Sequence, residues 1–148
     1  MKQILEQQLQ RFIKAQQQHY QIALSEIQAG QKSSHWMWYI FPQIAGLGYS
    51  EMAKHFAIKD RHEAIAYLAH PLLGQRLIAI SSALLQLKGN SAHAVFGSPD
   101  DLKLHSSMTL FAQQPNADPV FKKVLEKYFD GQLDQRTLAL LNNPESGQ

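Results

Sequence analysis

Residues that begin and end helices recur along the whole chain of 148 residues. Pro71 and Pro119 stand where helices are expected to begin, and proline is well accommodated at the first position of a helix. Gly30, Gly97 and Gly131 stand where helices are expected to end. Between these signals, apolar residues recur every three or four positions, whereas no segment shows the sustained alternation and hairpin turn of a strand pair. The sequence therefore predicts an all-α protein of about seven to nine helices without significant sheet.

The first expected helix is long and spans residues 5–28, and a buried central helix is expected between Pro71 and Leu87. Side chains that can accept a hydrogen bond from a free helical N–H predict the starts of the other helices. These caps are Ser34, Ser50, Asp60, Ser91, Ser98, Asp118 and Asp134. We expect residues 1–148 to form one compact domain, with a folded core over about 5–141 and a frayed tail over 142–148.

Charge and composition exclude several classes of protein. The net charge is only +2 and the basic residues are dispersed, which disfavours a nucleic-acid-binding protein. The chain contains no cysteine, so disulfides, thiolate zinc sites and a cysteine nucleophile are excluded. No apolar run approaches the length of a membrane span, and the N-terminus lacks the pattern of a signal peptide. We therefore expect a soluble, cytoplasmic protein that does not contact a membrane.

The segment of residues 33–48 combines aromatic and polar side chains unusually closely. Trp36, Trp38, Tyr39 and Phe41 fall within six residues, and aromatic side chains bury large areas. Trp36 and Trp38 would point to opposite sides of a regular helix, so one is expected in the core and the other at a ligand platform. Packing alone is the alternative for both.

Polar residues of the same segment are candidates for chemistry. His35 could act as a general acid or base, or donate a hydrogen bond to a phosphate or carboxylate. Its alternative is a buried histidine bonded to a backbone carbonyl. Lys32, Ser33 and Gln43 flank the aromatic residues and complete this first group.

A second group lies in the expected helix 99–112. Lys103, Ser106 and Ser107 could form a polar wall for a ligand, or the hydroxyls could simply allow close helix packing. Arg76 could bind a carboxylate or phosphate through its guanidinium, or pair with an acidic residue. The seven histidines show no metal-binding spacing, so we expect neither a metal nor another cofactor.

Two motifs together are highly specific for a known family. They read Ser-His-Trp-Met-Trp-Tyr-Ile-Phe-Pro-Gln over residues 34–43 and Ser-Ser-Met-Thr-Leu-Phe over residues 106–111. With Gly46-Leu47-Gly48 and His70-Pro71-Leu72-Leu73-Gly74, they resemble a widespread bacterial family of unknown function, over roughly residues 10–141. The resemblance implies a single all-helical domain and no known activity. Some members carry the label "calpastatin", which implies a protease inhibitor, but such inhibitors are disordered segments and this chain is rich in core-forming aromatics.

Two functions remain open from the sequence. The first is a site for a small anionic or phosphate-bearing ligand, with or without enzymatic activity, between segment 33–48 and helix 99–112. Its candidate residues are His35 as the catalytic group and Lys32, Ser33, Trp36, Trp38, Gln43, Arg76, Lys103, Ser106 and Ser107 as ligand-binding groups. The second is a protein-binding adaptor in which these residues are structural. The oligomeric state is left open.

Overall fold

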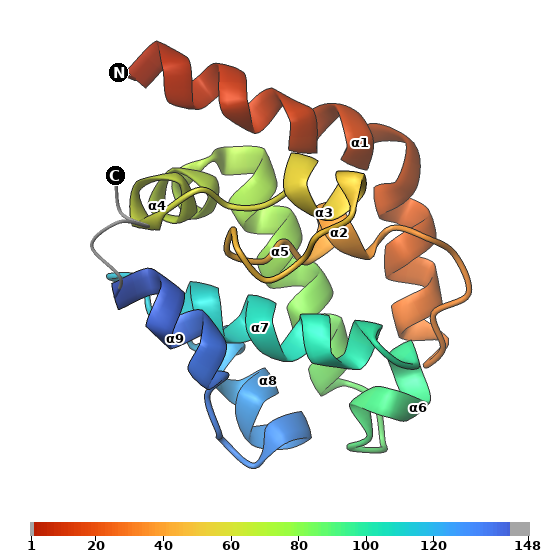
Figure 1. Ribbon diagram of the computed structural model, residues 1–148. Helices are drawn as coiled ribbons and strands as arrows, with labels where there is room; N and C mark the ends of the chain where they lie inside the picture. The colour runs from red at the N-terminus through yellow and green to blue at the C-terminus, as the bar shows by residue number, and fades with distance from the viewer. Residues whose placement is uncertain (1, 143–148) are drawn as a thin grey trace.

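A computed structural model describes residues 2–142, with side chains from Leu5 onward (Figure 1). Over these residues the chain forms nine helices and no strand, which confirms the predicted all-α class. They are α1 (Lys2–Gln28), α2 (Met37–Ile40), α3 (Glu51–His55), α4 (Arg61–Ala69), α5 (Pro71–Leu85), α6 (Ala92–Phe96), α7 (Asp100–Ala112), α8 (Pro119–Phe129) and α9 (Gln135–Asn142). The expected frayed tail lies outside the described residues except for Asn142, which ends α9.

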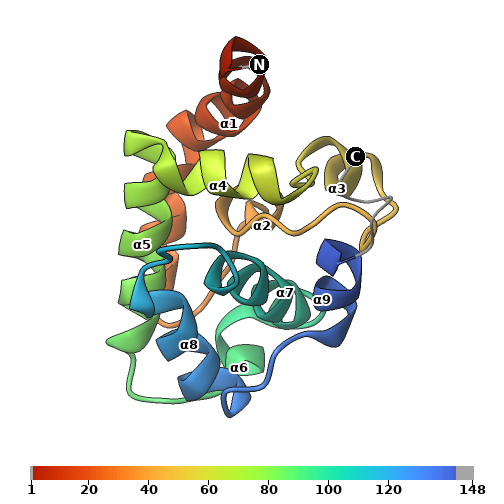
Figure 2. The same cartoon turned by 90° about the vertical axis from the view of Figure 1, so that its left-hand side faces the viewer.

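The helices surround one aromatic-rich core. In both views α7 lies beside α9, and the loop that follows α2 passes over them toward α3 (Figures 1 and 2). The most extensive packing joins α7 with α8, α5 with α8 and α1 with α5. The largest fully buried side chains include Phe12, Trp36, Phe41, Tyr67, Phe111 and Phe121. The aromatic segment 33–48 therefore contributes directly to the centre of the fold.

Helices α4 and α5 meet at a sharp corner, bent by 87° (Figure 2). His70 forms this corner, and its Nδ1 accepts hydrogen bonds from the N–H groups of Leu72 and Leu73 at the start of α5. A Cβ added to Gly74 would lie 2.2 Å from the Leu68 carbonyl oxygen, so only glycine allows α5 to pass this close to α4. Taken singly, none of the helices in residues 2–142 is both long and apolar enough for a membrane crossing.

Most expected helix starts are confirmed, and two are wrong. Ser50, Asp60 and Asp118 accept bonds from helical N–H groups as expected. Ser34 does not cap α2, because the helix begins only at Met37 with Trp36 at its N-cap position, and the Ser34 hydroxyl donates to Glu26 on α1. Ser98 does not cap α7, whose N-cap position is occupied by Pro99 without a side-chain bond.

A buried ion pair joins α1 to α4. The Arg11 guanidinium donates to both carboxylate oxygens of Glu63, at 3.0 and 3.2 Å. It also donates at 2.8 Å to each of the carbonyls of His55 and Ala57. Together these bonds fix the segment 55–59, whose Ile58 exchanges backbone bonds with the start of loop 43–50. That loop forms one wall of the cleft described next.

Candidate functional site

Glu26 near the end of α1 holds the turn that begins the aromatic segment. Its Oε1 accepts from the backbone N–H groups of Ser33 and Ser34 at 2.8 and 3.0 Å and from Trp36 Nε1 at 2.9 Å. Its Oε2 accepts from the Ser34 hydroxyl at 2.5 Å. Partial burial alone would raise the pKa of Glu26, but these hydrogen bonds to the carboxylate outweigh burial and lower the pKa to about 2. The turn is thus built around a stable negative charge.

Asp100 at the start of α7 connects two lysines. Its carboxylate lies 2.9 Å from Lys32 Nζ and 3.5 Å from Lys103 Nζ. The Lys32 side chain is only 7% exposed. Each ammonium also lies over a tryptophan ring, Lys32 at 4.9 Å from Trp36 and Lys103 at 5.1 Å from Trp38. The two polar groups predicted from the sequence are therefore joined in space through Asp100.

A surface cleft of about 460 Å³ opens beside this network. One wall is the loop after α2, with Tyr49 at its end, and the other is formed by α7 and the start of α9. The lining residues are Gln43, Leu47, Gly48, Tyr49, Ser50, Ala53, Pro99, Leu102, Lys103, His105, Ser106, Asp134 and Arg136. The expected location, between segment 33–48 and helix 99–112, thus contains a cleft, although α9 completes it.

Asp134 is an acidic side chain of the cleft lining that hydrogen bonds hold in place. Its Oδ2 accepts from the hydroxyls of Ser106 at 2.9 Å and Thr137 at 2.5 Å, and its N–H donates to Thr109 Oγ1 at 2.9 Å. Because both side-chain donors approach Oδ2, Oδ1 keeps its capacity to accept a hydrogen bond.

His105 is also fixed at the cleft. Its Nε2 lies 2.8 Å from the Gln132 carbonyl, and its ring stacks on Phe129 with centroids 4.3 Å apart. The carbonyl contact requires the proton on Nε2, so Nδ1 is the acceptor in the neutral ring.

The ten residues predicted from the sequence fall into three sets. Gln43, Lys103 and Ser106 line the cleft, and Trp38 lines a small recess that shares Gln43 with it. Three others do not line the cleft but belong to the charge network beside it. Lys32 forms an ion pair with Asp100, Trp36 is buried next to Lys32, and the Ser33 N–H donates to Glu26.

The other three lie apart from the cleft. His35 is exposed, and its carbonyl accepts from the Tyr39 hydroxyl at 3.3 Å. Arg76 faces α1, where it contacts Gln16 at 3.4 Å and the Tyr20 ring at 5.1 Å. Ser107 is fully buried in α7. The structural alternatives that the sequence suggested for these two residues are wrong. His35 is exposed rather than buried, and Arg76 contacts the Gln16 amide rather than an acidic residue.

Among the polar and aromatic residues that line the cleft, sequence reasoning did not select Tyr49, Asp134 or Arg136 for the site, and it gave His105 no role. Asp134 was recognised only as a helix cap. Arg136 lies in the first turn of α9, and no local motif distinguishes it from other surface cations. Asp134 and Arg136 reach the cleft only through the packing of α9 against α7.

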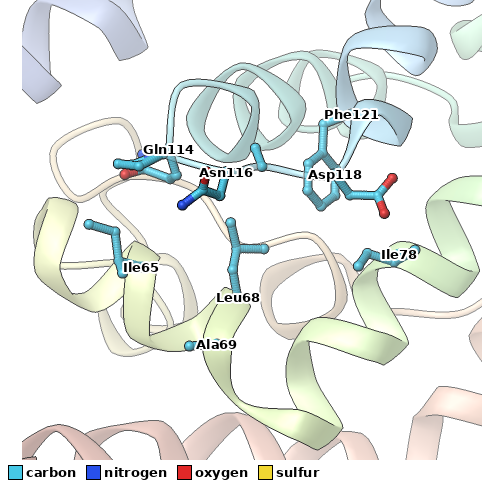
Figure 3. Close-up of a pocket in the computed structure, with 10 residues that line it drawn as sticks. Ile65, Leu68, Ala69, Ile78, Gln114, Asn116, Asp118 and Phe121 are labelled. Atoms are coloured by element: carbon cyan, nitrogen blue, oxygen red, sulfur yellow. The ribbon is translucent and has the colours of Figure 1, made fainter.

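A second cavity of about 400 Å³ lies between the α4–α5 corner and the loop joining α7 to α8. In Figure 3, Ile65 and Leu68 from α4 and Ile78 from α5 lie opposite Asn116 and Phe121. Its lining is mostly apolar, and Asp118 is engaged in capping α8. It therefore offers less chemistry than the first cleft. Within the described part of the chain, no group of three or more His, Asp and Glu side chains could hold a metal ion.

The fold and the cleft define a single-domain all-helical protein with a polar surface cleft. The chain belongs to the family described as "Protein of unknown function (DUF1810)", whose model matches residues 6–141. It is similar to the crystal structure of the conserved hypothetical protein Rv1873 from Mycobacterium tuberculosis, with 47% identity and a TM-score of 0.89 over 91% of this chain and 96% of that one. No protein with a curated description matches it significantly.

Proposed function

We propose that the protein binds a small ligand bearing a phosphate or another anionic group in the cleft between loop 43–50 and helices α7 and α9. One observation carries the proposal: Lys103 and Arg136 line the same cleft of about 460 Å³. A cleft of this volume lies within the range of roughly 300–1,000 Å³ that is typical of ligand pockets.

The charges in and behind the cleft favour an anion. Lys32, Lys103 and Arg136 provide three positive charges, against the two carboxylates of Asp100 and Asp134. Asp100 is shared by both lysines, so it cannot neutralise them fully. The lining itself carries Lys103 and Arg136 against Asp134, a net positive charge that would attract an anionic ligand.

Catalysis is a narrower claim than binding. His105 and Asp134 are titratable groups that line the cleft, whereas His35 lies outside it. If the ligand is transformed, His105 and Asp134 are the groups in position to hold or move a proton. A catalytic role for His35 and a cytoplasmic location both stay predictions from the sequence.

The adaptor function has one observation in its favour, the apolar cavity beside exposed Ile65. If the protein is an adaptor, the polar cleft has no part in binding its partner. The variant Ile65→Asp would then abolish the interaction, while substitutions at Lys103 would not.

Thermal unfolding with inorganic phosphate, ribose 5-phosphate and citrate tests anion binding. A ligand present at about 100 times its Kd stabilises the fold by about 2.7 kcal/mol, which raises Tm measurably. We expect stabilisation by at least one probe, and its loss in the variants Lys103→Gln and Arg136→Gln. Lys122→Gln, an exposed lysine of α8 outside the cleft, is the matched control. If no probe stabilises the protein, or if the cleft variants respond like the control, the proposal is wrong.

A further inference from the structure

We infer that the ligand of this cleft is a nucleoside monophosphate, held through its ring, its ribose hydroxyls and its phosphate by three different parts of the wall. This inference rests on the proposed function, because it assigns the anionic group to the phosphate. It adds two recognition elements that anion binding does not require.

The first element is an unusual apolar rim. Tyr49 is 80% exposed and Leu102 is 62% exposed, and both line the cleft. They are the two most exposed large apolar side chains of the described structure. An open aromatic ring at the edge of a cleft can stack on a planar base, whatever the base is. A ligand without a ring would leave this apolar surface in water.

The second element is Asp134. The hydroxyls of Ser106 and Thr137 both donate to Oδ2, which fixes the carboxylate and leaves Oδ1 to accept from a ligand. An anionic group would be repelled by this oxygen, so the part of the ligand beside it must donate hydrogen bonds. Vicinal hydroxyls of a ribose provide such donors.

The third element is the pair of cations. Lys103 is held toward Asp100 and the Trp38 ring, while Arg136 lies in the first turn of α9 beyond Asp134. A guanidinium offers two parallel donors to phosphate oxygens. Ring, hydroxyl and phosphate sites thus occur together in one cleft, and nucleoside monophosphates carry all three groups.

Isothermal titration calorimetry with the full chain tests this inference. The probes are the four nucleoside 5′-monophosphates, ribose 5-phosphate, and the 2′,3′-dideoxy form of the tightest nucleotide. We expect the tightest nucleotide to bind at least tenfold more tightly than ribose 5-phosphate, as stacking on one aromatic side chain provides. We also expect removal of the hydroxyls to weaken binding.

The variants separate the ring site from the phosphate site. Tyr49→Ala should remove the tenfold preference while leaving the affinity for ribose 5-phosphate unchanged. Met52→Ala removes another exposed apolar side chain, outside the cleft lining, and should leave both affinities unchanged. Asp134→Asn should reduce the discrimination against the dideoxy nucleotide.

Equal binding of ribose 5-phosphate and every nucleotide would overturn the inference, as would a nucleotide affinity that Tyr49→Ala does not alter. In either case the proposed anion site would still stand. Absence of binding by all of these phosphates would overturn the inference, and if citrate and inorganic phosphate also fail to raise Tm, the proposed function is wrong as well.

Discussion

Replacing Glu26 with glutamine should remove a pH-dependent part of the free energy of unfolding. The glutamine Oε1 can keep the three N–H donors from Ser33, Ser34 and Trp36, and the Ser34 hydroxyl can rotate to accept from the amide. Shape and hydrogen-bond number are nearly preserved, so the variant mainly removes the negative charge.

The magnitude follows from the pKa of the carboxyl group. Hydrogen bonding lowers the pKa of Glu26 from its ordinary value of 4.5 to about 2, although burial acts in the opposite direction. A difference of 2.5 in pKa corresponds to about 3.4 kcal/mol. Because the carboxylate is partly exposed, solvent screening reduces this to about 2 kcal/mol.

The sign follows from linkage. A carboxyl group with a lowered pKa in the folded state binds fewer protons when folded than when unfolded. Its contribution is therefore complete above pH 4.5 and is lost as the pH falls toward 2. Below that value, the wild-type protein and Glu26→Gln should have similar free energies of unfolding.

Urea unfolding of both proteins at several pH values between 7 and 2 measures this contribution. Their difference should be about 2 kcal/mol at pH 7 and should decline below pH 4.5. The difference between the free energies of unfolding of the two proteins cancels the contributions of the other carboxyl groups. A difference that stays constant down to pH 2 would refute the assignment of a low pKa to Glu26.

Three further variants test other parts of the structure. Arg11→Ala should lower the free energy of unfolding by about 3–5 kcal/mol in urea titrations, because it leaves the buried Glu63 carboxylate without its cation; a loss below 1 kcal/mol would contradict this. Asp100→Asn should tighten phosphate binding severalfold in calorimetry, because the carboxylate no longer competes for Lys103, and weaker binding would argue against Lys103 as a ligand group. Lys127→Met should lower the free energy of unfolding by about 1 kcal/mol, and therefore lower Tm, because the Lys127 ammonium donates to carbonyls at the end of α5. An unchanged Tm would show that these bonds do not stabilise the end of α5.

Local helix signals predicted most of the fold because their physics is local. Ser50, Asp60 and Asp118 cap helices whose N–H groups lie only two or three residues away. The Ser34 expectation was wrong because a distant residue positions the side chain: the hydroxyl donates to the Glu26 carboxylate, eight residues upstream, and this charge-assisted bond orients it toward α1. Nothing in the spacing of Ser34 distinguishes this partner from the N–H groups of the next helix.

The site was predictable only in part. Lys103 and Ser106 lie on the face of α7 that lines the cleft, and Gln43 lies within the aromatic segment 33–48, which contributes to the opposite wall. Asp134 and Arg136 reach the cleft because α9 packs against α7, a tertiary contact that no periodicity encodes.

The polar groups between the aromatic residues bind two different carboxylates. Their closeness in the sequence made them look like one group, although they have different partners. Ser33, Ser34 and the indole N–H of Trp36 satisfy the Glu26 carboxylate, while Lys32 satisfies Asp100. Burying aromatic side chains in a turn leaves polar backbone and indole groups that need such partners. Their charge networks hold the turn against α1 and α7, whereas the cleft is lined by the loop after α2, by α7 and by the start of α9. Substitutions in the turn should therefore change stability first, whereas those at the exposed cleft residues should change binding first.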